Sequence, residues 1–377
     1  MKILLAGNLI GQGGIQSHLK WLSKALGEEG LEVMILSLTT TPKESGHNLP
    51  EFSTIEESNI QIVYCNSSKW RRLTEITAII KKFSPNVYLA VGTGWNLFIP
   101  PLLSRVKTRK IFHEVMSGVP NGVHDSRWIV RWFFNEVIGQ SPTITKTFAE
   151  CFGWKKALIA IPAMPEPLEL TASLPQIVSK KVELGKAKAA LFSRLVPHKQ
   201  AFWLVQQWDL LKDFLGELHI HGSGPEESLI REYIAHQKIG DRVKCFGRYP
   251  EGQAYVDLLS SYDLTLLPTI GAEGAPLVLL ESMACGVPFV AYGVGGIPDY
   301  DNPNVVIVSP DSWIINKDKY SLKTSKDSES NTFIRAVVEM TNNLAAGKIN
   351  QSDLQQFYLE RYSYQELKNA WFSYLCT

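Results

Sequence analysis

Short apolar runs alternate with longer mixed segments along most of the chain, and this pattern predicts an α/β protein. Between residues 2 and 165 the runs are rich in aliphatic and β-branched residues, and the intervening segments are long enough for crossover helices. The runs cover residues 2–7, 32–38, 60–65, 87–92, 110–115 and 157–162. Because strands that read as almost continuous apolar runs are buried on both faces, we expect a mostly parallel sheet.

A second alternation of the same kind follows a break in the pattern. Three prolines and mixed charges mark residues 166–186 and their immediate surroundings as a linker. We therefore expect one domain over residues 1–165 and another over residues 187–359. Ligands of doubly wound sheets bind at the carboxyl ends of the strands, so two such units predict a binding cleft between them. The second set of runs covers residues 189–195, 217–224, 243–247, 264–269, 288–293 and 305–310.

Composition narrows the classes of protein that fit this pattern. The 377 residues include 38 Lys+Arg and 37 Asp+Glu, and this balance argues against a nucleic-acid partner. The five cysteines are scattered and odd in number, which is typical of a reducing compartment. The apolar start of the chain is interrupted by polar residues and glycines, and no apolar run approaches the roughly 18 residues of a spanning helix. We expect a soluble, cytoplasmic protein.

The most informative segment for chemistry follows the predicted strand at residues 264–269. Gly274, Ala275 and Pro276 open a predicted helix, with Pro276 as its first residue and Leu277 as the next. The small side chains leave the helix start sterically open. Its free N–H groups and positive dipole end are suited to bind a diphosphate.

Two glutamates flank this helix start, with seven residues between them. Glu273 precedes the helix, and Glu281 lies inside it on a stripe that we expect to be buried. A buried carboxylate needs hydrogen-bond donors, which ligand hydroxyls would supply. In the alternative reading, Glu273 only complements the helix dipole and Glu281 is paired with a lysine or arginine from elsewhere in the fold.

The segment EGAPLVLLESMACGVPFVAYGVGGIPD, with its E-x7-E spacing, resembles the signature of the retaining glycosyltransferases of family 4. The resemblance implies a GT-B fold, in which two Rossmann-like domains face each other across a cleft. It also implies that a C-terminal helical segment, residues about 360–377, returns to complete the N-terminal domain. In this interpretation the first domain binds the acceptor and the second binds the nucleotide sugar.

Further landmarks of the family extend along the chain. FSRLVPHKQ resembles the basic pair of the family and places Arg194 and Lys199 against the donor diphosphate. At three positions around this pair the chain departs from the family: Ser193 replaces a glycine, His198 an acid and Gln200 another glycine. His113 in KIFHEV stands where the family has a histidine near the donor sugar.

The resemblance also supplies the remaining site residues. The double glycine of GQGGIQSH would approach the phosphates from the first domain, and HIHGSGPEE resembles a glycine-rich turn. VKCFGRY matches a segment that lines the nucleobase pocket. The expected catalytic residues are Glu273, His113, Arg194 and Lys199. The expected donor-binding residues are Gly13, Gly14, Arg194, Lys199, Gly222, Gly247, Arg248, Glu273, Gly274, Ala275, Pro276, Leu277 and Glu281.

The predicted reaction is transfer of a hexosyl-type sugar from a nucleoside-diphosphate sugar, with UDP favoured by the resemblance, to a hydroxyl of a glycan or lipid-linked acceptor. The leaving diphosphate gains negative charge, which Arg194, Lys199 and the helix start would stabilise. We therefore expect no metal and no cofactor, and the strand-end loops contain no D-x-D pair. Three alternatives share the architecture: a nucleotide-sugar epimerase, a phosphorylase and a non-catalytic regulatory subunit. A dinucleotide-dependent oxidoreductase fits less well, because threonines follow the second predicted strand where an acid would bind ribose.

Two segments of the first domain combine basic and aromatic or aliphatic residues. They are residues 69–82, KWRRLTEITAIIKK, and residues 125–134, DSRWIVRWFF. Residues 1–170 hold 18 basic and 14 acidic residues, whereas the rest of the chain holds 20 and 23. This asymmetry is compatible with peripheral contact to the cytoplasmic face of an anionic membrane. An ordinary amphipathic crossover helix and core aromatics explain the same pattern, and we favour that explanation.

Overall fold

The computed structural model describes residues 1–9, 13–38, 59–65, 69–177, 182–271, 273–310 and 329–377. The chain divides into two compact units. Unit 1 contains Met1–Glu166 and Tyr364–Thr377, and unit 2 contains Pro167–Ser363. The first boundary falls at the start of the predicted linker, residues 166–186, and the short helix α8 (Leu168–Thr171) lies inside that range.

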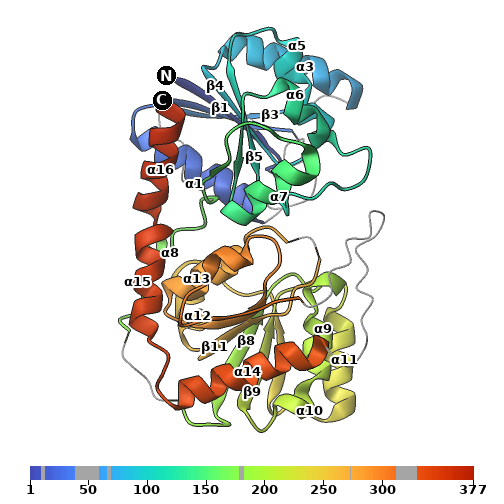
Figure 1. Ribbon diagram of the computed structural model, residues 1–377, viewed down its shortest axis with the longest axis vertical. Helices are drawn as coiled ribbons and strands as arrows, with labels where there is room; N and C mark the ends of the chain where they lie inside the picture. Colours follow the sequence, from blue (N-terminus) through green and yellow to red (C-terminus); the bar gives the residue numbers. More distant parts are fainter. Residues whose placement is uncertain (10–12, 39–58, 66–68, 178–181, 272, 311–328) are drawn as a thin grey trace. The chain divides into compact units, whose positions relative to one another are not determined.

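Unit 1 is built on a seven-stranded parallel sheet with the order β3-β2-β1-β4-β5-β6-β7 (Figure 1). Leu5 of β1 lies opposite Ile35 of β2 and Leu89 of β4. All five residues of β4 are buried, as expected for a strand covered on both faces. The strands are β1 (Lys2–Gly7), β2 (Glu32–Ser37), β3 (Ile60–Tyr64), β4 (Val87–Val91), β5 (Arg109–Glu114), β6 (Glu136–Gly139) and β7 (Ile159–Ala160).

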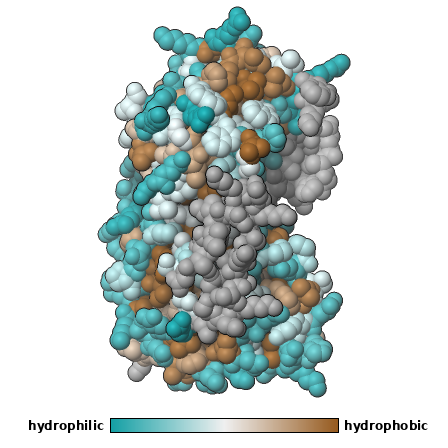
Figure 2. Space-filling model, turned by 45° about the vertical axis from the view of Figure 1, so that its right-hand side comes forward, coloured by the Kyte–Doolittle hydropathy of each residue, from teal (hydrophilic) through white to brown (hydrophobic). Residues whose placement is uncertain are grey.

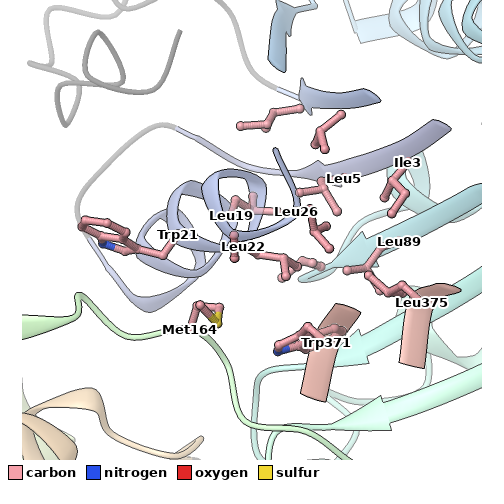
Figure 3. Close-up of a cluster of buried hydrophobic side chains, with 14 of the residues drawn as sticks. Ile3, Leu5, Leu19, Trp21, Leu22, Leu26, Leu89, Met164, Trp371 and Leu375 are labelled. Carbon is pink, nitrogen blue, oxygen red and sulfur yellow. The ribbon is translucent and has the colours of Figure 1, made fainter. Parts of the chain in front are cut away.

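The helices of unit 1 complete the α/β alternation. The C-terminal helix α16 (Tyr364–Cys376) packs against α1, and Trp371 is fully buried there. Figure 3 shows Trp371 and Leu375 in one cluster with Leu19 and Leu22 of α1 and with Ile3, Leu5 and Leu89 of the sheet. The other helices are α1 (Gly14–Glu28), α3 (Lys69–Phe83), α4 (Trp95–Phe98), α5 (Pro100–Leu103), η2 (Ser126–Ile129), α6 (Val130–Phe133) and α7 (Pro142–Phe152).

Unit 2 has a six-stranded parallel sheet with the order β10-β9-β8-β11-β12-β13. The first crossovers build outward from β8 to β10, and the chain then returns to β11 on the other side of β8. This reversal of strand order puts the carboxyl ends of β8 and β11 side by side, where doubly wound sheets bind ligands. The strands are β8 (Ala187–Phe192), β9 (Leu215–His221), β10 (Val243–Gly247), β11 (Leu264–Leu267), β12 (Phe289–Tyr292) and β13 (Val306–Val308).

Helices and 3-10 turns connect these strands. Of special interest for the site are η3 (Pro197–Lys199), which follows β8, and α13 (Leu277–Ala284), which follows β11. The others are α9 (Ala201–Gln206), α10 (Trp208–Leu211), α11 (Glu227–Gln237), α12 (Gly252–Ser260), η4 (Ile297–Tyr300), α14 (Glu329–Ala345) and α15 (Gln351–Arg361).

Candidate functional site

The structure brings two of the predicted site residues of unit 2 into direct contact. Lys199 at the end of η3 forms an ion pair with Glu273, and their side chains are only 11% and 15% exposed. The two loops are fixed to each other by the Ile270 amide, which donates to the His198 carbonyl at 2.9 Å. The pair therefore lies where the carboxyl ends of the neighbouring strands β8 and β11 meet.

A glycine turn supports the backbone that carries Glu273. Gly295 has φ +58°, and a Cβ at this position would lie 2.0 Å from the Glu273 carbonyl oxygen. The Gly296 amide donates to the Gly274 carbonyl at 2.9 Å. Glycine is therefore required at position 295 of the GVGG sequence after β12, because any side chain there would displace the backbone that carries Glu273.

Helix α13 begins one residue later than the sequence predicts. Pro276, the predicted first helical residue, is the N-cap, with ψ 122°, so Leu277 is the first residue of the helix. The extended backbone at Pro276 turns the chain into the helix without a side-chain cap. The first N–H groups of α13 consequently have no capping side chain within the part of unit 2 described, and Gly274 and Ala275 add no bulky group near them.

Glu281 has a partner that the sequence pattern does not reveal. Its Oε2 accepts a hydrogen bond from the Tyr255 hydroxyl at 2.6 Å, and Tyr249 stacks on Tyr255 with ring centroids 5.1 Å apart. Burial and the nearby Glu281 charge raise the pKa of both tyrosines, so both remain protonated donors. The Tyr249-Tyr255 pair follows Arg248 in the sequence, but neither spacing nor composition points to its contact with Glu281.

Backbone hydrogen bonds join the segment that carries Arg194 to the glycine-rich turn. The Ser193 and Leu195 amides donate to the carbonyls of His221 and Ser223. A Cβ on Gly222, where φ is +136°, would lie 1.7 Å from the Ser193 carbonyl oxygen. Gly222 is therefore required for close packing of two protein loops, while the Arg194 side chain itself is exposed.

His198 is a titratable group beside the ion pair. Burial lowers the pKa of His198, the positive charges of Lys199 and Arg194 lower it further, and Glu273 acts in the opposite direction. His198 is thus within electrostatic reach of Lys199, Arg194 and Glu273. The predicted nucleobase residues are close to the carboxyl end of β10: Gly247 has φ +78°, and the Arg248 side chain is 60% exposed and lies 3.8 Å from Glu251.

In unit 1, the predicted residues occupy two different environments. Gly13 is the N-cap of α1 with an extended backbone, and Gly14 is the first helical residue. Residues 11 and 12 of the same motif lie outside the described residues. His113 lies in β5 and is completely buried, with its Nδ1 2.9 Å from Nε2 of His18. Sequence reasoning missed His18, although it lies in the same GQGGIQSH motif.

The structure contradicts a membrane-contacting surface over residues 125–134 at the five buried positions of the segment, which include Arg127 and Phe134. Arg127 is 0% exposed and forms ion pairs with Glu114 at 2.7 Å and Asp125 at 2.6 Å. Phe134 is 1% exposed and belongs to the core. A buried guanidinium needs carboxylates around it, so Arg127 is held inside the fold and cannot reach a lipid.

Several of the other basic and aromatic candidates in unit 1 are at the surface. Trp132 and Phe133 are 61% and 52% exposed. In α3, Ile76 and Ile80 are buried while Arg71, Lys81 and Lys82 are exposed, as in an amphipathic crossover helix. Figure 2 shows a hydrophobic area at the surface of unit 1, at the top of the view. Across the described residues, none of the helices has the length and apolar character of a membrane span.

Parts of the chain are similar in sequence to known proteins. Residues 187–317 match the family model "Glycosyl transferases group 1". An exopolysaccharide phosphotransferase of Streptomyces coelicolor is 33% identical over 134 residues, which are 35% of this chain but 14% of that protein. An uncharacterized glycosyltransferase of Haemophilus influenzae is 24% identical over 292 residues, covering 76% of this chain and 78% of the relative.

The fold has counterparts among solved structures over its whole length. HepE of Anabaena in complex with UDP-glucose aligns with a TM-score of 0.71 and 17% identity, covering 100% of this chain and 99% of the other. Sucrose-phosphate synthase of Thermosynechococcus elongatus aligns with a TM-score of 0.73 and 15% identity, covering 99% and 98%. The fold of this chain, two doubly wound parallel α/β units, is the GT-B fold.

Proposed function

We propose that this protein is a retaining glycosyltransferase that moves a hexosyl-type sugar from a nucleoside-diphosphate sugar to an acceptor hydroxyl. The observation that carries the proposal is the Lys199–Glu273 ion pair at the adjoining carboxyl ends of β8 and β11. It lies next to the uncapped start of α13, within the segment that matches the family model. The E-x7-E resemblance to family 4 supports the same assignment.

The proposed roles follow from the charges of the reaction. The bond between the anomeric carbon and the diphosphate oxygen breaks, and the leaving diphosphate gains negative charge. Lys199, Arg194 and the N–H groups at the start of α13 stabilise that charge. Glu273 then exchanges its ion pair for the hydroxyls of the donor sugar, and Glu281 with Tyr255 binds ribose. This scheme needs neither a metal ion nor a cofactor.

Retention is proposed to follow from attack on the face that the diphosphate leaves. The acceptor hydroxyl forms the new bond to the anomeric carbon, and its proton passes to the departing phosphate oxygen. A double-displacement route would require a carboxylate nucleophile on the opposite face of the sugar. Proton NMR of the first product formed tests this point: an α-linked donor should give an α-linked product, and a β-linked first product would contradict retention.

UDP is the proposed nucleotide. The support is the family resemblance together with the fold shared with HepE, whose structure contains UDP-glucose. A thermal-shift screen with UDP, GDP and ADP tests the choice, because a ligand that binds the native state raises its apparent stability. UDP should give the largest shift, and the shift should disappear in Lys199→Met but persist in Lys238→Met, which changes an exposed lysine on unit 2. A larger shift with GDP or ADP would contradict UDP and identify guanine or adenine as the base of the donor.

A turnover assay distinguishes the proposed enzyme from the alternative functions. Incubation with UDP-[¹⁴C]glucose and UDP-N-acetyl-[¹⁴C]glucosamine, with and without glycan and lipid-linked acceptors, should release UDP and yield a labelled product. An epimerase would instead convert the free sugar nucleotide, and a regulatory subunit would bind donor without turnover. Binding of donor without release of UDP under all these conditions would contradict the enzymatic proposal.

A glycan or lipid-linked acceptor bound by unit 1 is the proposed second substrate, and the cytoplasmic membrane face is its proposed location. Trp132 and Phe133 are exposed, and with the half-buried Arg131 beside them they offer aromatic and basic groups for peripheral contact. Co-sedimentation with phosphatidylglycerol vesicles tests this contact. Binding should weaken in Trp132→Ser/Phe133→Ser. Equal binding to neutral vesicles would contradict the role of the basic group, and no binding to anionic vesicles would contradict the membrane contact.

A further inference from the structure

Two buried histidines in unit 1 form a direct hydrogen bond. His18 on α1 and His113 in β5 are both 0% exposed, and His18 Nε2 lies 2.9 Å from His113 Nδ1. The ring of Trp371 on α16 lies beside both, with centroid distances of 5.4 and 4.8 Å. Met164 belongs to the same buried cluster, next to α1 (Figure 3).

The position of each ring proton follows from one backbone amide. The Met164 N–H lies 2.9 Å from His18 Nδ1, and an amide can only donate. His18 Nδ1 is therefore the acceptor and carries no proton. Because burial lowers the pKa of His18 to about 3, the ring is neutral and its single proton is on Nε2. That proton is donated to His113 Nδ1.

His113 is consequently held in one tautomer. Its Nδ1 accepts from His18, so its own proton is on Nε2. Burial and the neighbouring His18 lower the pKa of His113 well below its usual value, and hence it is also neutral. The relay runs from the Met164 amide through two imidazoles and ends in an N–H donor at His113 Nε2.

This terminal donor has no acceptor in the described part of the structure. His113 Nε2 is buried and lacks a hydrogen-bond partner. The Ile161 backbone is close enough to raise the pKa of His113, yet no acceptor among the described residues has hydrogen-bonding geometry to Nε2. A buried donor without a partner is costly, and a bound ligand oxygen is one of the groups that would satisfy it.

We propose that His18 is a positioning residue that fixes His113 as a neutral Nε2–H donor for a hydroxyl oxygen of the bound sugar substrate. His113 then acts as a hydrogen-bond donor and as neither a general base nor a cation. The ligand part of this proposal rests on the proposed glycosyltransferase function. The tautomer part rests on the hydrogen bonds of unit 1 alone.

The tautomer is measured directly by two-bond ¹H–¹⁵N NMR of the full-length protein labelled with [¹⁵N]histidine. The chain has eight histidines, and the signals of His18 and His113 are assigned from the variants His18→Gln and His113→Gln. Both residues should show the Nε2–H pattern of neutral imidazole between pH 6 and 8. An Nδ1–H tautomer or a charged ring at His113 would overturn the proposal.

Two variants of similar size then separate positioning from packing. Gln at position 18 retains an N–H that can donate to His113 Nδ1, whereas Met fills the same space without a donor. His18→Met should release His113 into a mixture of tautomers, and His18→Gln should keep the Nε2–H form. Circular dichroism checks that both variants fold. If His18→Met does not fold, the wild-type and His18→Gln spectra still decide the tautomer.

Kinetics with the sugar nucleotide found in the turnover assay test the ligand part. His18→Met should lower kcat/KM about tenfold, the size expected for one lost hydrogen bond, and His18→Gln should recover most of it. The affinity for UDP, which has no sugar, should stay within about twofold in both variants. Equal kcat/KM in the Met and Gln variants would overturn the role of His18. If no donor is turned over at all, the proposed function fails while the NMR result still decides the tautomer.

Discussion

His198 is a third titratable group beside the Lys199–Glu273 ion pair, and its pKa should respond to a bound anionic ligand. Lys199 and Arg194 lower the pKa of His198 in the free protein, Glu273 opposes them, and burial has the largest effect. A bound diphosphate would add negative charge beside the same cations. It should raise the pKa of His198, so that binding is accompanied by proton uptake.

The resulting prediction is that a sugar nucleotide binds more tightly at pH 6.0 than at pH 7.5. Each unit by which binding raises the pKa can add at most tenfold in affinity, so we expect a gain of about three- to tenfold. Calorimetric titration at the two pH values measures it, with His198→Gln as the control that should bind almost independently of pH. Equal or weaker binding at pH 6.0 in the wild type would contradict a position of His198 beside the bound diphosphate.

The buried pair His18–His113 makes a separate prediction about acid stability. The folded-state pKa of His18, about 3, is below the unfolded value near 6.5, so the unfolded chain binds more protons between these values. The contribution of neutral His18 to the free energy of unfolding is therefore fully present above pH 6.5 and is lost as the pH falls below this value. At pH 5 His18 alone should cost about 2 kcal/mol. Urea unfolding at pH 7 and pH 5 measures the loss, which should be smaller in His18→Gln; a pH-independent midpoint would contradict it.

At the scale of elements, the loops at the carboxyl ends of β8 and β9 must pack at backbone distance. Gly222→Ala would place a Cβ 1.7 Å from the Ser193 carbonyl oxygen, and we expect it to destabilise unit 2 by more than about 3 kcal/mol. Gly347→Ala is the matched control, because Gly347 also has positive φ but a Cβ there would meet nothing within 4 Å. It should cost only about 1 kcal/mol in chemical denaturation. Equal losses would show that backbone strain, and not the collision, requires Gly222.

The elements that sequence patterns predict best are the buried strands. Each of the twelve apolar runs overlaps a strand, and the signal is clearest where full burial on both faces makes the run continuous, as in β4. Strand β6 is missed by the pattern: its four residues, Glu136–Gly139, follow directly on an aromatic segment and are too short for a period to emerge. The predicted run at 189–195 extends past β8, which ends at Phe192: the Ser193 amide still donates to His221, the last residue of β9, whereas the Leu195 amide donates to Ser223 in the loop after it.

The candidate site is predictable only in part, because contacts between residues far apart in the sequence leave no local pattern. Lys199 and Glu273 can be named from the sequence, and the topology of β8 and β11 brings them together. Tyr255, His198 and His18 cannot be assigned a role in this way, because their relevance arises from contacts with Glu281, the ion pair and His113. Arg127 is misjudged because a basic residue beside tryptophans looks like a surface residue until its two carboxylate partners are known.

At the scale of the whole molecule, the chain leaves unit 1 at Glu166 and returns to it at Tyr364. Trp371 on the returning helix is fully buried, and its Nε1 donates to the Pro162 carbonyl at 2.9 Å. Trp371→Ala should therefore destabilise unit 1 by about 3–5 kcal/mol while leaving unit 2 unchanged. Scanning calorimetry should resolve this as a lower temperature for one transition. Trp132→Ala, at a 61% exposed position, is the control and should change neither transition; an equal effect of both variants would contradict the role of α16.

The proposed function assigns to Glu273, paired with Lys199, the binding of the reacting part of a sugar nucleotide during glycosyl transfer. The most direct test is the rate of UDP release from the sugar nucleotide by the wild type and by Glu273→Gln. Removal of one preorganised polar group from an active site typically costs about 10²–10³-fold in kcat, and we expect a loss in that range. Glu232→Gln, an exposed change on α11, should keep the wild-type rate. Undiminished turnover in Glu273→Gln would contradict this role of Glu273.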